Sequence, residues 1–156
     1  MGIAFNKNLV LLEISAATQY ELLDKVADNL FKLGYVKDTY KGAVIAREKI
    51  FATGLPTMNG GGVAIPHTDI EHVNTAAICF ARLAKPVEFV VMGDESSKVK
   101  VDLVFMLALK EAHAQIEMLQ ALMGVIQDEE ALDYLKKANV DEICKFVQEK
   151  LPNVGA

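Results

Sequence analysis

The sequence has few cysteines, and they form no recognisable framework. Cys79 and Cys144 stand far apart and belong to no CxxC pair and no metal-ligand spacing. They predict two reduced, mostly buried thiols in a cytoplasmic protein, and no signature of a nucleophilic cysteine surrounds either of them.

A basic surface and a long apolar segment are also lacking. The 156 residues carry 16 Lys and Arg against 21 Asp and Glu, a formal net charge of -5. This balance, with no lysine- and arginine-rich run, argues against nucleic-acid binding. No stretch approaches the roughly 18 apolar residues that a membrane span needs, and the N-terminal MGIAFNKN does not resemble a secretory signal. We therefore expect a cytoplasmic protein with no direct membrane insertion.

The order of predicted elements indicates one α/β domain over residues 1–156. Apolar runs predict strands at residues 9–14, 63–66, 76–83, 87–92 and 99–109. Amphipathic segments predict helices at residues 18–33, 38–49, 113–126, 129–137 and 140–151, with a Gly- and Pro-rich loop at 52–62. Since residues 76–92 look like a hairpin among alternating strands and helices, we expect a layered α/β sandwich, a mixed β-sheet flanked by helices.

His67 is the first candidate for chemistry, in the stretch GGGVAIPHTDIEH at residues 60–72. Pro66 has no N–H and a fixed φ, so it ends the strand and presents the next side chain from a rigid base at the sheet rim. The preceding glycines match neither a dinucleotide fingerprint nor a P-loop, although they allow a phosphate or partner to come close. The alternative is a histidine satisfied by a local backbone carbonyl at a strand end.

An imidazole in this place acts as a base, a metal ligand or a nucleophile. Thr68 follows His67, but no nucleophile-elbow motif surrounds it, which disfavours the base. Asp69 and His72 complete an imaginable metal site, yet the two histidines are five residues apart and not at the i, i+4 spacing of a helical zinc site. We expect no metal and no cofactor. A nucleophilic imidazole needs a neutral ring, and a hydrogen bond from one nitrogen to a backbone carbonyl fixes that tautomer.

His113 and Arg47 are the other candidates. His113 lies three residues before Ile116 on an apolar stripe, in the first helical turn, where free N–H groups suit a phosphate. The alternative is that it only shields the core. Arg47 follows Tyr40 and Val44 on an apolar helix face and either extends to solvent or points at an anion.

Three blocks, in this order, resemble the enzyme IIA component of the bacterial phosphoenolpyruvate-dependent sugar phosphotransferase system, in its mannitol/fructose-type superfamily. GVAIPHTD at residues 62–69 is similar to the active-site signature, and AREKIFATGLPT at 46–57 is similar to the REK…PTG segment, with Ala52 where proline is frequent. VDLVFMLALKEAHAQIEMLQALM at 101–123 resembles the central strand leading to a second histidine. PHTDIEHV and KPVEFVVMG resemble the galactitol-type branch.

The resemblance implies a phosphocarrier subunit with phosphotransferase activity. His67 would accept a phosphoryl group through Nε2 from the histidine phosphocarrier protein and pass it to a cysteine of an enzyme IIB partner, which serves the membrane IIC transporter. His113 would stabilise the phosphoryl group, and Arg47 would stabilise its charge. The implied substrate is a sugar alcohol, galactitol first.

Two rivals stay open. One is a regulatory module of the same fold, whose phosphorylation at His67 signals to a regulator, and the other is a small-molecule binding module. For any of the phosphoryl-transfer roles, Ile65, Ile70 and Val73 around His67 predict an apolar docking patch.

Overall fold

Two long antiparallel strands form the centre of the protein. The computed structural model describes residues 2–155. β5 (Ala77–Val91) pairs along its length with β6 (Asp94–Ala108), and the mixed sheet has seven strands in the order β3-β4-β6-β5-β1-β7, with β2 also paired to β5. The shorter strands are β1 (Ile3–Ala4), β2 (Val10–Ile14), β3 (Gly54–Pro56), β4 (Gly62–Ala64) and β7 (Val154–Gly155). β4 runs parallel to β6 and antiparallel to β3.

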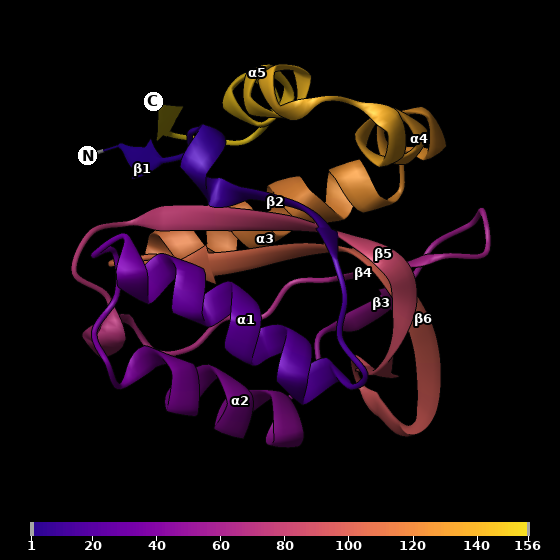
Figure 1. Ribbon diagram of the computed structural model, residues 1–156, viewed down its shortest axis with the longest axis horizontal. Coiled ribbons are helices and arrows are strands. Elements are labelled where there is room, and N and C mark those ends of the chain that lie inside the picture. The colour runs from indigo at the N-terminus through magenta and orange to yellow at the C-terminus, as the bar shows by residue number, and fades with distance from the viewer. Residues whose placement is uncertain (1, 156) are drawn as a thin grey trace.

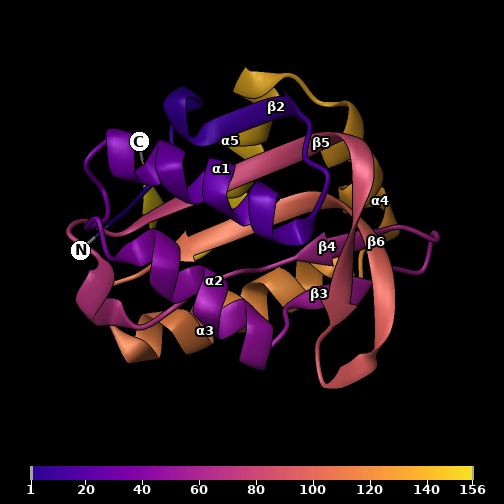
Figure 2. The same ribbon diagram turned by 60° about the horizontal axis from the view of Figure 1, so that its bottom comes forward.

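Helices cover both faces of this sheet (Figure 1). They are α1 (Gln19–Lys32), α2 (Tyr40–Ile50), α3 (Ala112–Ile126), α4 (Glu129–Lys137) and α5 (Val140–Lys150), with short 3-10 helices η1 (Lys7–Leu9) and η2 (Ile70–His72). Figure 2 shows α1 and α2 on one face and α3 to α5 on the other. The predicted layered α/β sandwich with a mixed sheet is confirmed. No helix within residues 2–155 is long and apolar enough to cross a membrane.

The core explains why the second half of β6 is an unbroken apolar run. Every residue from Leu103 to Leu109 is buried, because helices cover the sheet on both sides and leave neither face of the strand to water. Phe80 on β5 packs edge-to-face against Phe105 with ring centroids 5.1 Å apart. This pair of strands is the rigid platform on which β4 and the segment after it are placed.

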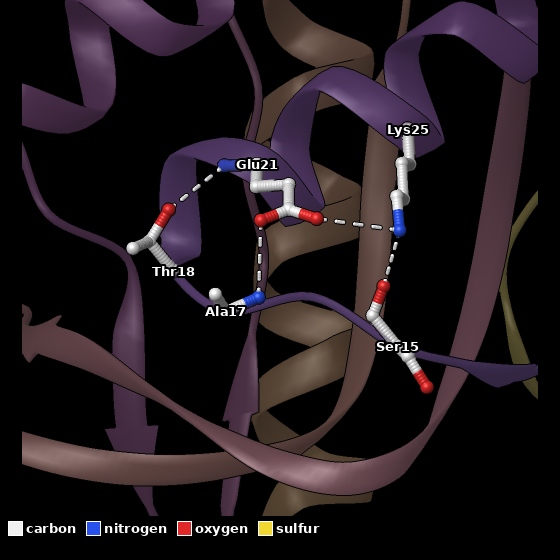
Figure 3. A network of polar contacts seen from close by, with 5 residues as sticks. All are labelled: Ser15, Ala17, Thr18, Glu21 and Lys25. Atoms are coloured by element: carbon white, nitrogen blue, oxygen red, sulfur yellow. Dashed lines mark hydrogen bonds and ion pairs between the residues drawn. The ribbon is translucent and has the colours of Figure 1, made fainter.

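The start of α1 confirms a predicted helix boundary (Figure 3). The Thr18 hydroxyl accepts a hydrogen bond from the Glu21 N–H, which caps the helix. The Glu21 carboxylate accepts from the Ala17 N–H and pairs with Lys25, whose ammonium also donates to the Ser15 carbonyl. Local side-chain chemistry therefore fixes where this helix begins.

Two predictions about the strands are wrong. Residues 76–92 form no hairpin, since β5 is one strand whose register shifts between Arg82 and Val87. This irregularity accommodates Pro86, which has no N–H to give to the ladder. The hairpin instead joins β5 to β6 through Met92 and Gly93, so residues 93–98, expected as a polar connection, mostly belong to β6.

The segment 52–62 is also more ordered than predicted, because it contains β3 and the start of β4. A Cβ at Gly54 would lie 2.6 Å from the Val90 carbonyl oxygen, and one at Gly62 would lie 2.8 Å from a Val99 methyl carbon. These glycines permit close packing of β3 and β4 against the β5–β6 hairpin and are not simply loop residues.

Candidate active site

His67 follows the end of β4, where the chain leaves the sheet. β4 ends at Ala64, two residues earlier than predicted. The next two residues stay tied to neighbouring strands: the Ile65 N–H donates to the Thr53 carbonyl at 3.4 Å, and the Leu107 N–H donates to the Pro66 carbonyl at 2.9 Å. Ile65 and Pro66 are buried, whereas His67 is only partly so. The predicted placement at a rigid sheet rim is confirmed.

A backbone carbonyl fixes the imidazole. His67 Nδ1 lies 2.9 Å from the Ile65 carbonyl oxygen. Because a carbonyl only accepts hydrogen bonds, Nδ1 carries the proton, and Nε2 of the neutral ring keeps its lone pair. From sequence, a hydrogen bond to a local backbone carbonyl was the alternative to a functional role for His67. The structure contains this hydrogen bond, and it leaves Nε2 free to react.

The surroundings also keep the ring neutral. Burial lowers the pKa of His67 below 6.5, and the positive charge of Arg47 lowers it further, although the Ile65 hydrogen bond and the Asp69 carboxylate act in the opposite sense. The neutral imidazole therefore predominates at pH 7. Such a ring attacks an electrophile through Nε2.

Arg47 comes to this site from the last turn of α2. One of its terminal nitrogens lies 3.8 Å from a carboxylate oxygen of Asp69, two residues after His67. Its guanidinium carbon lies 5.2 Å from the ring centroid of Phe51, a contact within the range of cation–π attraction. Within residues 2–155, its buried Nε has no hydrogen-bond partner. The arginine therefore brings a positive charge close enough to His67 to lower its pKa.

His113 lies at the start of α3 and is exposed. The same turn reaches the segment after His67, since the Gln115 side chain donates to the Thr68 carbonyl at 2.9 Å. The apolar stripe predicted for this helix, Ile116, Leu119, Met123 and Ile126, is only partly right. Ile126 is buried and Leu119 packs against the core, but Ile116 is 57% exposed, and the other buried residues of α3 are Met118, Leu122 and Val125. His113 shares the outward face with Ile116, three residues on, and so does not shield the core.

The apolar patch predicted around His67 needs a similar correction. Ile65 and Val73 are buried, and of the three residues only Ile70 is exposed. Ile65 points into the core, and Val73 forms a bridge with Val36. Sequence reasoning missed the exposed Phe51, for which the available signal was its position four residues after Arg47.

His72 and Glu48 have structural contacts. His72 Nδ1 lies 2.8 Å from the Thr39 hydroxyl, which ties η2 to the start of α2. Glu48 is a buried acid that sequence reasoning also missed, although its spacing of four from Val44 places it on the buried face of α2. Among the residues that the structure describes, no group of three His, Cys, Asp or Glu side chains is arranged to hold a metal ion.

The fold and the site define a class: α/β domains that present the unprotonated nitrogen of a neutral histidine at the rim of a mixed sheet. Comparison with known proteins makes the family specific. Residues 3–150 match the family described as "Phosphoenolpyruvate-dependent sugar phosphotransferase system, EIIA 2". The chain belongs to this family of phosphotransferase components.

Two relatives in sequence differ in how much of their own length the match covers. The chain is 31% identical over 122 residues to the galactitol-specific EIIA component of Escherichia coli K12, which covers 78% of this chain and 80% of that protein. It is 40% identical over 102 residues to the transcriptional regulator ManR of Bacillus subtilis, covering 65% of this chain. The match spans only 14% of the regulator's length.

Solved structures share the fold. The crystal structure of IIA mannitol from Escherichia coli superposes with a TM-score of 0.71 at 26% identity and covers 92% of this chain and 98% of that one. A complex of the mannitol enzyme IIA with phosphorylated enzyme IIB, also from Escherichia coli, gives a TM-score of 0.73 at 25% identity, covering 92% and 96% of the two chains.

The electrostatics of the site predict how His67 titrates. We expect its pKa below 6.5 in the wild type, a higher value in Arg47→Gln because a repelling positive charge is removed, and a lower value in Asp69→Asn because an attracting carboxylate is removed. NMR titration of the His67 ring signals measures all three. A wild-type pKa at or above 6.5, or shifts of the same sign in both variants, would contradict this electrostatic description.

Proposed function

We propose that the protein is a phosphocarrier. His67 accepts a phosphoryl group on Nε2 from the histidine phosphocarrier protein and passes it to a cysteine thiolate of an enzyme IIB partner. The observation that carries this proposal is the Nδ1 contact with the Ile65 carbonyl, which leaves Nε2 as the nucleophile in a chain of the EIIA family. The complex of a related IIA with a phosphorylated IIB supports the identity of the acceptor.

The chemistry balances with the groups present. As Nε2 attacks, a nitrogen–phosphorus bond forms and the corresponding bond of the donor phosphohistidine breaks. The imidazole gains positive charge while Nδ1 keeps its proton, so the hydrogen bond to the Ile65 carbonyl becomes charge-assisted. In the second step the thiolate sulfur attacks phosphorus, and Nε2 leaves with its electron pair. Positioning and charge stabilisation supply most of the catalysis in such transfers.

Arg47 and His113 take supporting roles in this proposal. The terminal nitrogens of Arg47 offer donors to the phosphoryl oxygens in exchange for the exposed Asp69 carboxylate. His113 stands in the first turn of α3, which Gln115 ties to Thr68, and it donates a ring N–H to the phosphoryl group. Together they offset the negative charge that arrives with the phosphoryl group.

The proposed substrate of the transport system is a sugar alcohol, and galactitol is the preferred candidate. The galactitol-specific EIIA of Escherichia coli supports this choice, because the match spans most of both chains. The IIB partner then hands the phosphoryl group on for uptake through a membrane IIC transporter, and the carrier itself works in the cytoplasm. The second candidate is a regulatory module whose phosphorylation at His67 signals to a regulator, and the similarity to part of ManR favours it.

Phosphorylation tests the role of His67. Incubation with phosphoenolpyruvate, enzyme I and the histidine phosphocarrier protein should label the wild type with an acid-labile, base-stable phosphate. His67→Gln should not label, because it removes the only proposed acceptor nitrogen. His72→Gln is the matched control and should label normally. Labelling of His67→Gln at the wild-type level would show that the acceptor is another residue.

Onward transfer tests the role of His113 and separates the two candidates. His113→Ala should still accept phosphate but should pass it to a galactitol-type IIB at least about tenfold more slowly, since one stabilising donor is lost. The measurement is loss of label from the carrier against its gain on IIB, with mannitol-type IIB in parallel. Wild-type transfer by His113→Ala would contradict the supporting role. A wild type that labels but transfers to neither IIB favours the regulatory module.

A further inference from the structure

Glu48 is a buried carboxylate close to the site in sequence but outside the proposed chemistry. It lies in the last turn of α2, next to Arg47, and is only 4% exposed. One carboxylate oxygen accepts the Thr53 N–H at 2.8 Å, and the other accepts the Thr53 hydroxyl at 2.9 Å. Burial raises the pKa of Glu48, and these two hydrogen bonds act in the opposite sense. An ionisable group is costly to bury, and the two hydrogen bonds from Thr53 offset part of this cost. The same hydrogen bonds hold Thr53 in place.

Thr53 in turn leads to the catalytic histidine. Its carbonyl accepts the Ile65 N–H at 3.4 Å, which extends the β3–β4 pairing by one step beyond Gly54 and Ala64. The Ile65 carbonyl accepts from His67 Nδ1 at 2.9 Å. Three consecutive contacts thus connect the Glu48 carboxylate to the imidazole. Because the N–H and the C=O of one residue belong to different peptide planes, this connection acts by fixing backbone position and not by passing polarisation along.

The other side of the histidine segment is held independently. The Leu107 N–H donates to the Pro66 carbonyl at 2.9 Å, and the buried Tyr40 hydroxyl donates to the Leu107 carbonyl at 2.6 Å. The Pro66 carbonyl is therefore anchored to β6, whereas the Ile65 N–H is anchored to Thr53. Loss of the Thr53 anchor would allow the Ile65 carbonyl to rotate while the rest of the sheet stays in place.

We propose that Glu48 is a positioning residue for His67, which acts through Thr53 and Ile65 to aim the carbonyl that sets the imidazole tautomer. The link to phosphoryl transfer rests on the proposed function, whereas the effect on the tautomer does not. The same contact fixes the end of α2. Glu48 therefore also helps to position the backbone of the neighbouring Arg47, whose side chain extends to Asp69.

The test compares variants of the Glu48–Thr53 contact. Glu48→Ala removes both acceptors, Glu48→Gln keeps one oxygen acceptor in the same shape, Thr53→Val removes the hydroxyl, and Thr53→Ser keeps both donors. ¹⁵N NMR of the histidine ring reports the tautomer of neutral His67, and the rate of labelling by the histidine phosphocarrier protein reports its competence. We expect the Nδ1–H tautomer fraction to fall most in Glu48→Ala, less in Glu48→Gln and Thr53→Val, and not in Thr53→Ser.

The labelling rate should follow the same order, with a loss of about tenfold in Glu48→Ala, the size expected for residues that orient a reactive group. Asp102→Asn is the matched control. Asp102 is another carboxylate whose pKa burial raises, paired with Lys136 at 3.5 Å, and its loss should leave the His67 tautomer unchanged. Thermal unfolding of each variant separates lost stability from lost positioning.

Unchanged ¹⁵N shifts and an unchanged labelling rate in a folded Glu48→Ala protein would show that Glu48 serves only stability. If Glu48→Ala does not fold, the same readouts in Glu48→Gln and Thr53→Val decide. A wild type that takes no phosphate contradicts the proposed function, whereas a wild-type tautomer in these variants contradicts the positioning role, so the two failures are distinguishable.

Discussion

The hydrogen bond between His67 Nδ1 and the Ile65 carbonyl is the constraint on which the site depends. It requires a carbonyl held two residues before the histidine, and the fold holds the peptides on either side of that carbonyl through Thr53, just before β3, and through Leu107 near the end of β6. Pro66 lies between Ile65 and His67 and stops the strand from continuing past the histidine. The strand β4 thus ends just before His67, and the buried residues that follow it fix the direction of the Nε2 lone pair.

One positive charge serves two states of the same ring. Burial lowers the pKa of His67 most, and the positive charge of Arg47 lowers it further, so the ring stays neutral before the proposed transfer. In the proposed function, the phosphoryl group would bring negative charge to the same place, and the arginine would then stabilise that charge. Before transfer, Arg47 contacts the solvent-exposed Asp69 carboxylate at 3.8 Å. Because an exposed ion pair contributes little free energy, replacing this carboxylate by a phosphoryl group would cost little.

Local chemistry made part of this site predictable from sequence. A proline before a histidine indicates a strand end, and a threonine with a glutamate three residues on marked the start of α1 correctly. The exposure of Ile116 at the start of α3 was not predictable, since this residue is as apolar as a core residue and its exposure depends on where the helix crosses the sheet. Glu48 was missed for the opposite reason: an acid in a helix is expected at the surface until its partner, Thr53 in the link between α2 and β3, is known.

The most direct test of the proposed role of His67 is to find the atom to which the phosphoryl group is attached. Long-range ¹H–¹⁵N NMR of the phosphorylated protein, with labelled histidine, distinguishes a phosphoryl group on Nε2 from one on Nδ1. We expect the phosphoryl group on Nε2 of His67, with Nδ1 still protonated and hydrogen-bonded to the Ile65 carbonyl. A phosphoryl group on Nδ1, or on a different histidine, would contradict it.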